Sequence, residues 1–78
     1  MIYAMKPCFQ NGKPMKRVIV YFEAKDKDEA FKAFGVGHFW GGYSENTAFT
    51  AEEVDSVPKN GRFCIAADVI EENKETNF

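Results

Sequence analysis

Residues 29–43, Glu29-Ala-Phe-Lys-Ala-Phe-Gly-Val-Gly-His-Phe-Trp-Gly-Gly-Tyr43, join a helix, a glycine stop and a cluster of aromatic side chains in one short stretch. Asp26 precedes this stretch as a helix N-cap, and Glu29 completes a capping box with it. The helix has an apolar stripe at helical spacing, formed by Ala30, Phe31, Ala33 and Phe34. Gly35 is expected to end the helix in the left-handed conformation, leaving room for one short helical turn over residues 37–43.

Two strands are expected before this helix. The first covers residues 2–9 and contains Pro7, which predicts an edge position or a bulge at that point. Asn11-Gly12 is the strongest hairpin signal in the chain. The second strand is expected over residues 15–24, where apolar side chains alternate, so the first two strands should be antiparallel.

The segment after residue 47 is expected to hold a brief helix and a last strand. Thr50 and Glu53 form a second capping-box pattern, which predicts a short helix that ends at Pro58. The last strand is expected over residues 62–70 because its apolar side chains alternate, and residues 71–78 have the composition of a frayed polar tail.

These elements predict one α+β domain covering residues 1–78. Its sheet has three mainly antiparallel strands, the order along the chain is strand, strand, helix, short helix, strand, and the helices pack on one face. The order of strands across the sheet is either 2-1-3 or 1-2-3, because Pro7 is awkward in a central strand.

Composition limits the classes of function. The 78 residues make a single domain, and a 45% hydrophobic content is enough for a packed core. The longest apolar run, residues 18–22, is too short to cross a membrane, and the N-terminus lacks the pattern of a signal peptide. We therefore expect a cytoplasmic protein that does not contact a membrane.

The net charge of −2 is unevenly distributed along the chain. Residues 1–44 carry seven basic and four acidic side chains, whereas residues 45–78 carry three basic and eight acidic ones. One end of the molecule is therefore expected to be basic and the other acidic, without strong non-specific affinity for nucleic acid.

Few residues are arranged for catalysis or for metal binding. His38 is the only histidine, and the sequence offers it no evident partner. Cys8 and Cys64 lie in strand-like runs, where they are expected to be buried thiols, or a disulfide if the first and last strands pair. A metal site would need more ligands than these three residues supply. We therefore expect a non-enzymatic protein without a cofactor or a metal ion.

An aromatic cluster follows the expected helix. The topology there is that of a helix-turn-helix, but no Lys or Arg occurs between Val36 and Val57, so a DNA-reading helix is not expected. Phe39, Trp40 and Tyr43 are either a core plug or a rigid anchor for a protein partner. The second candidate contact is the acidic pair Glu52 and Glu53, which also suits an ordinary helix N-terminus.

A basic group near the hairpin tip supports a second hypothesis. Lys13, Lys16 and Arg17 are either part of a solvated turn or a weak contact for nucleic acid through the hairpin. A third hypothesis is a homo-oligomer that forms through a free strand edge.

Three segments carry a resemblance to known proteins. They are Lys27-Asp-Glu-Ala-Phe-Lys-Ala-Phe-Gly-Val36, Tyr43-Ser-Glu-Asn-Thr47 and the run from Pro58 to Phe63. Together they resemble small uncharacterised phage-encoded proteins, in which such segments recur in this order. The resemblance covers residues 20–65 and carries no known activity. It implies a phage or mobile-element protein that binds a host protein in the host cytoplasm, for example a component of a defence system, and modulates or inhibits it.

Overall fold

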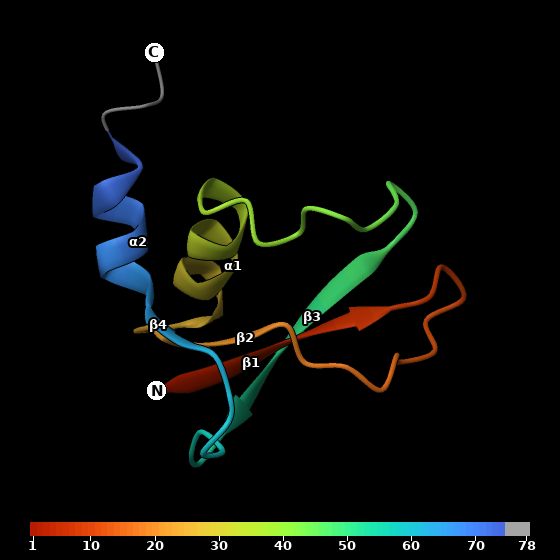
Figure 1. Cartoon of the computed structure of the whole chain (residues 1–78), viewed down its shortest axis with the longest axis horizontal. Coiled ribbons are helices and arrows are strands. Elements are labelled where there is room, and N and C mark those ends of the chain that lie inside the picture. Colours follow the sequence, from red (N-terminus) through yellow and green to blue (C-terminus); the bar gives the residue numbers. More distant parts are fainter. Residues whose placement is uncertain (75–78) are drawn as a thin grey trace.

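Four strands and two helices occur in the part of the chain that the computed structural model describes, residues 1–74 (Figure 1). In chain order they are β1 (Ile2–Cys8), β2 (Val20–Glu23), α1 (Lys27–Val36), β3 (Ala48–Val54), β4 (Phe63–Ile65) and α2 (Ala66–Glu72). The sheet order is β3-β1-β2-β4; β1 is antiparallel to both of its neighbours, and β4 is parallel to β2. The α+β class is confirmed, and the prediction of three strands is wrong.

The additional strand is β3, where the sequence predicted a helix beginning at Thr50. β3 pairs with β1 along its whole length, from Ile2 opposite Val54 to Cys8 opposite Ala48. Because side chains alternate in a strand, Thr50 and Glu53 lie on opposite faces of the sheet and do not form a capping box. A helix N-cap contributes only about 1 kcal/mol, which is less than a seven-residue ladder on a central strand provides.

The predicted last strand ends at Ile65, and helix α2 follows it. Ala66 and Val69 are buried at a spacing of three residues, as on one face of a helix, whereas Ala67 is exposed. The apolar positions therefore fit both the two-residue period of a strand and the helical period, and the prediction of a strand beyond Ile65 is wrong. Glu71 and Glu72, which were assigned to the frayed tail, belong to α2; residues 75–78 of that tail lie outside the described residues.

The observed strand order, β3-β1-β2-β4, agrees with each of the two predicted orders at one point and differs from it at another. The last strand lies beside β2, as in the order 1-2-3. The edge position beside β1, which the order 2-1-3 gave to the last strand, belongs to β3 instead. The first strand is therefore central although it contains proline.

An irregular segment of the neighbouring chain explains how Pro7 fits into this central strand. Met5 is opposite Val20, and the Ile19 amide donates to the Met5 carbonyl at 2.9 Å. Beyond this point the register shifts by three residues, so that Cys8 is opposite Pro14. The missing N–H of Pro7 thus falls beside the irregular segment of residues 15–19. β1 itself is central and keeps a regular register with β3 through Pro7, so neither the predicted edge position nor a bulge in the first strand occurs, and the second strand is shorter than predicted.

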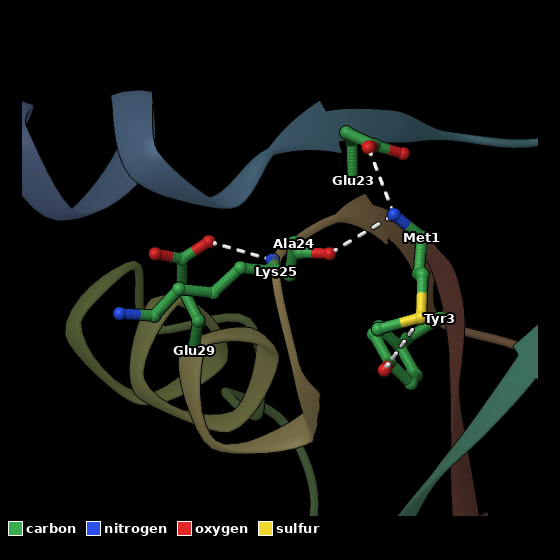
Figure 2. Close-up of polar contacts among 6 residues, drawn as sticks. All are labelled: Met1, Tyr3, Glu23, Ala24, Lys25 and Glu29. Atoms are coloured by element: carbon green, nitrogen blue, oxygen red, sulfur yellow. Dashed lines mark hydrogen bonds and ion pairs between the residues drawn. The ribbon is translucent and has the colours of Figure 1, made fainter.

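Helix α1 begins with the predicted cap. The Glu29 amide donates to the Asp26 Oδ1 at 2.9 Å. The Glu29 carboxylate accepts a hydrogen bond from the Lys25 amide at 3.1 Å (Figure 2). Next to this cap, the amino group of Met1 lies between the Glu23 carboxylate (2.9 Å) and the Ala24 carbonyl (3.1 Å) (Figure 2). The β2–α1 junction is therefore held by polar contacts from both sides.

Both helices cover the same face of the sheet (Figure 1). The strands and helices contribute to one apolar core, whose buried members include Tyr3, Met5, Val20, Phe22, Ala30, Ala33, Phe34, Ala51, Ala66 and Val69. On the other face, residues 55–62 run from β3 at one edge to β4 at the other, and Gly61 lies close to the Tyr21 ring and to Val57. Neither of the two described helices is long and apolar enough to cross a membrane.

The cap yields a prediction about stability. Asp26→Ala should lower the free energy of unfolding by about 1 kcal/mol, because the Glu29 amide loses its hydrogen-bond acceptor. Asp28→Ala removes a negative charge from the same first turn but not the cap, and should have a smaller effect. Urea denaturation followed by circular dichroism measures both variants. Equal losses would contradict the role of Asp26 as a cap.

Tyr3 yields a prediction about alkaline pH. Burial, with the nearby carboxylates of Glu53 and Asp26, raises the pKa of the Tyr3 phenol above its usual value of 10.0. Below pH 10 the phenol is protonated in both states and has no effect on the pH dependence. Above pH 10 it ionises first in the unfolded chain, so the free energy of unfolding should fall as pH rises further.

Urea midpoints at pH 8 and pH 10.5 test this pH dependence. Tyr3→Phe should show a smaller alkaline loss than the unchanged protein. Tyr21→Phe, on the other face of the sheet, keeps Tyr3 and should retain the full loss. An identical alkaline loss in Tyr3→Phe would show that the Tyr3 phenol does not cause it.

Candidate protein-binding site

Residues 37–43, here called the aromatic turn, connect α1 to the segment that leads into β3. Successive turns replace the short helix that was predicted there. The Gly37 amide donates to the Ala33 carbonyl at 2.9 Å, and the Phe39 amide donates to the Phe34 carbonyl at 3.2 Å. The Gly41 amide donates to the His38 carbonyl at 3.3 Å. The first two bonds attach the turn to the last turns of α1, and the third lies within the turn.

The end of α1 differs from the prediction. Gly35 lies within the helix, and Gly37 is the C-cap with an ordinary φ of −83°. The left-handed residue is His38, with φ of 58°. This conformation costs a non-glycine residue about 1–2 kcal/mol, so contacts elsewhere in the turn must maintain it.

Phe39 is half-buried and packs against the core. Its ring makes an edge-to-face contact with Phe22 at a centroid distance of 5.2 Å, and it is stacked with Phe34 at 6.3 Å. The guanidinium of Arg62 lies over this ring, 4.7 Å from its centroid. The interpretation of a core plug therefore fits Phe39.

Tyr43 fixes the other end of the turn. Its ring contacts Phe49 of β3 edge-to-face at 5.5 Å, and the guanidinium of Arg17 lies over it at 5.7 Å. The Tyr43 hydroxyl is buried and has no hydrogen-bond partner among the described residues. Tyr43 thus attaches the aromatic turn to β3 and to the β1–β2 connection.

Trp40 lies between these two attached residues and is 48% exposed. Its ring centroid is 6.5 Å from that of His38, with the planes tilted by 48°. It is also the only tryptophan in the chain. The predicted cluster is therefore divided: Phe39 and Tyr43 hold the turn, and Trp40 is presented to solvent.

The acidic pair lies at the other end of β3. Glu52 and Glu53 are both exposed, and they point to opposite faces of the sheet. Glu52 forms an ion pair with Lys6 of β1. Glu53 is four residues from Phe49, about 13 Å along the strand, so the structure does not place the pair beside the Tyr43 contact.

The basic side chains of the hairpin are exposed in the β1–β2 connection. Of Lys13, Lys16 and Arg17, it is Arg17 that reaches the aromatic turn, through the Tyr43 ring. The sequence did not predict that the basic and aromatic candidates meet. Arg17 lies in the irregular segment of residues 15–19, where the sequence predicted a regular strand.

Two exposed apolar residues were also missed. Phe63 and Ile65 of β4 are each 46% exposed, and their side chains lie on the face without helices, beside Tyr21 and Glu23. The alternation in residues 62–70 predicted only that these apolar side chains share one face of a strand. Phe31, which was included in the apolar stripe of the helix, is 40% exposed as well.

The residues considered for thiol and metal chemistry lie apart. Cys8 is buried and Cys64 is half-buried, and both thiols are free. They occupy opposite faces of the sheet. Cys8 is three residues after the core-facing Met5 in β1, so its side chain lies on the face away from the helices. Cys64 lies opposite the core residue Phe22, so its side chain lies on the helix-covered face. Within residues 1–74, no three or more His, Cys, Asp and Glu side chains are grouped to bind a metal ion.

Comparison with known proteins gave no matching family model, no matching curated protein and no matching solved structure. The resemblance to phage-encoded proteins therefore stays a prediction.

Gly37 yields a prediction about the aromatic turn. A Cβ atom at this position would lie 2.4 and 2.7 Å from two ring carbons of Phe39, which is packed on Phe22 and Phe34. Gly37→Ala should therefore displace Phe39 and lower the free energy of unfolding by about 1–3 kcal/mol.

Gly35→Ala is the matched control, two residues earlier on α1. A Cβ atom there meets nothing within 4 Å, so this variant should gain about 0.5–1 kcal/mol from helix propensity. Urea denaturation of both variants should give shifts of opposite sign. Two stabilised variants would show that Phe39 is not locked in the core.

Proposed function

We propose that this protein is a small, non-enzymatic interaction module, and that Trp40 is the anchor with which it binds a protein partner. One observation carries the proposal: Trp40 is half-exposed at the centre of a turn whose flanking aromatic residues, Phe39 and Tyr43, are packed. Tryptophan is enriched at binding hot spots because it offers a large apolar area and an N–H donor.

The size of the anchor is sufficient for specific binding. A large aromatic side chain buries up to roughly 250 Å², so covering the exposed half of Trp40 would remove on the order of 120 Å² from water. At about 25 cal/mol per Å² this contributes roughly 3 kcal/mol, or about a hundredfold in Kd.

Pre-organisation supports the same proposal. A mobile loop loses conformational freedom when it binds, and this loss reduces affinity. The aromatic turn is hydrogen-bonded to α1 at one end and packed on β3 at the other. The strained His38 backbone is kept in place by these contacts, as is common at functional turns.

The partner that suits this anchor is a protein with an apolar pocket of indole size. The resemblance to phage-encoded proteins adds that the partner is a host protein, in the host cytoplasm, whose activity is modulated or inhibited when its pocket is occupied. An 8.9 kDa chain is large enough to block such a pocket and the surface around it.

Replacement of the anchor tests the proposal. Trp40→Ala should abolish capture of the partner from nuclease-treated host lysate, while the circular dichroism spectrum and melting temperature stay nearly unchanged. Phe31→Ala, which removes a similarly exposed aromatic ring from α1, is the matched control and should retain capture. Trp40 is the only tryptophan of this chain, so its fluorescence reports on the aromatic turn. Its emission should shift to shorter wavelength when the captured partner covers the indole.

Two outcomes would contradict the anchor. Loss of the fold in Trp40→Ala would make Trp40 a structural residue. Binding that survives in Trp40→Ala, weakens steeply with salt and is lost when Lys13, Lys16 and Arg17 are changed together would favour the nucleic-acid hypothesis instead.

A further inference from the structure

Among the described residues, strand β3 lies at the edge of the sheet and is paired on one side only, with β1. The Met1 and Met5 carbonyls accept hydrogen bonds from Ala24 and Ile19 on the β2 side, so the odd-numbered backbone groups of β1 point toward β2. The even-numbered groups of β1 then point toward β3, where Ala4 is opposite Glu52 and Lys6 is opposite Thr50.

The orientation of the β3 backbone follows from this pairing. Its even-numbered amides bond to β1, and the N–H and C=O groups of Phe49, Ala51 and Glu53 point away from the sheet. Among the described strands, β3 has no neighbour on that side. The free edge is thus a template for another strand.

The sequence of β3 suits pairing with itself. Ala51 is the midpoint of Ala48–Val54, so an antiparallel pair with its two-fold axis at Ala51 pairs all seven residues of both copies. The outward groups then match: Ala51 is opposite Ala51 of the second copy, and Phe49 is opposite Glu53. Each of these pairs exchanges two backbone hydrogen bonds.

Charge favours the same arrangement. On the face without helices, Glu52 of one copy would lie opposite Thr50 of the other, and beyond Thr50 lies Lys6 of β1. The distance between these strands is two strand spacings, roughly 10 Å, which the extended Lys and Glu side chains can span. Lys6 already pairs with Glu52 within one chain, so two Lys6 and two Glu52 side chains would alternate around the axis.

Other arrangements place like charges together. A parallel pair in register would bring Glu52 beside Glu52 and Glu53 beside Glu53, and an antiparallel pair centred on Glu52 would do the same for that residue. A pair centred on Thr50 would leave Val54 outside the shared ladder. The second sheet edge, β4, has only three residues before α2 begins.

We propose that two copies of this protein associate through β3, antiparallel about Ala51, into one continuous eight-stranded sheet. This inference is independent of the Trp40 proposal, because it uses the strand edge and not the aromatic turn. The two are tested by different variants, and either can fail alone.

Sedimentation velocity over a range of protein concentrations, at about 50 mM salt, tests the association. The unchanged protein should shift from monomer to dimer as concentration rises. Glu52→Lys places four positive side chains around the axis and should weaken the dimer at least tenfold. The double variant Lys6→Glu with Glu52→Lys restores alternating charges and should recover it. Glu71→Lys, the same charge change on exposed α2, is the control and should leave the dimer intact.

Amide hydrogen exchange by NMR tests the register. The amides of Phe49, Ala51 and Glu53 should gain protection when concentration rises, whereas those of Thr50 and Glu52, already bonded to β1, should change little. A monomer at every concentration would overturn the proposal. A dimer that is unaffected by Glu52→Lys, or that does not protect the odd-numbered amides, would also overturn it.

Discussion

The central position of β1 determines where the other elements lie. β1 makes antiparallel ladders with β2 on one side and β3 on the other. Its core-facing side chains, Tyr3 and Met5, are almost fully buried beneath the helices. A central strand needs N–H donors on both sides, and Pro7 is tolerated because its missing N–H faces the irregular segment of residues 15–19 instead of a regular ladder. β3 and β4 are consequently the two edges, and the connection between them must cross the sheet.

Short sequence patterns such as a capping box predicted an element correctly only where its tertiary contacts favour the same element. The capping boxes at Asp26 and at Thr50 have the same pattern, yet only the first one starts a helix. The difference is tertiary: residues 48–54 gain a complete ladder with β1, and no single-sequence pattern reveals that this strand exists. Around Ala66 the reason is different, because the alternation of apolar residues there fits both a strand and a helix face, and only the burial of Ala66 and Val69 against α1 decides between them.

The sequence predicted the aromatic cluster as a candidate site, but not which of its residues are packed and which is exposed. Two interpretations of the aromatic cluster, core plug and exposed anchor, were alternatives in the sequence, and in the structure they apply to neighbouring residues. Phe39 is packed because Gly37 leaves room for its ring, and the chain then reverses through the left-handed His38 and exposes Trp40. Composition and spacing cannot predict which of these aromatic residues is packed, since this depends on which ring contacts Phe22 in the folded chain. The exposed Phe63 and Ile65 were missed for a related reason, because alternation indicates two faces without showing which face the helices cover.

The two sheet edges differ in how they avoid unwanted pairing. β4 is short and is ended by α2, so it offers almost no ladder to another chain. β3 has seven residues and, in the described part of the chain, no strand beyond it; Glu52 and Glu53 disfavour arrangements that bring these acids together. The same two charges leave one arrangement favourable, in which each acidic half lies against the uncharged half of another β3 with Lys6 nearby. In the dimer that we propose, a strand edge that carries charge at one end only therefore favours an antiparallel copy of the same strand and disfavours other arrangements.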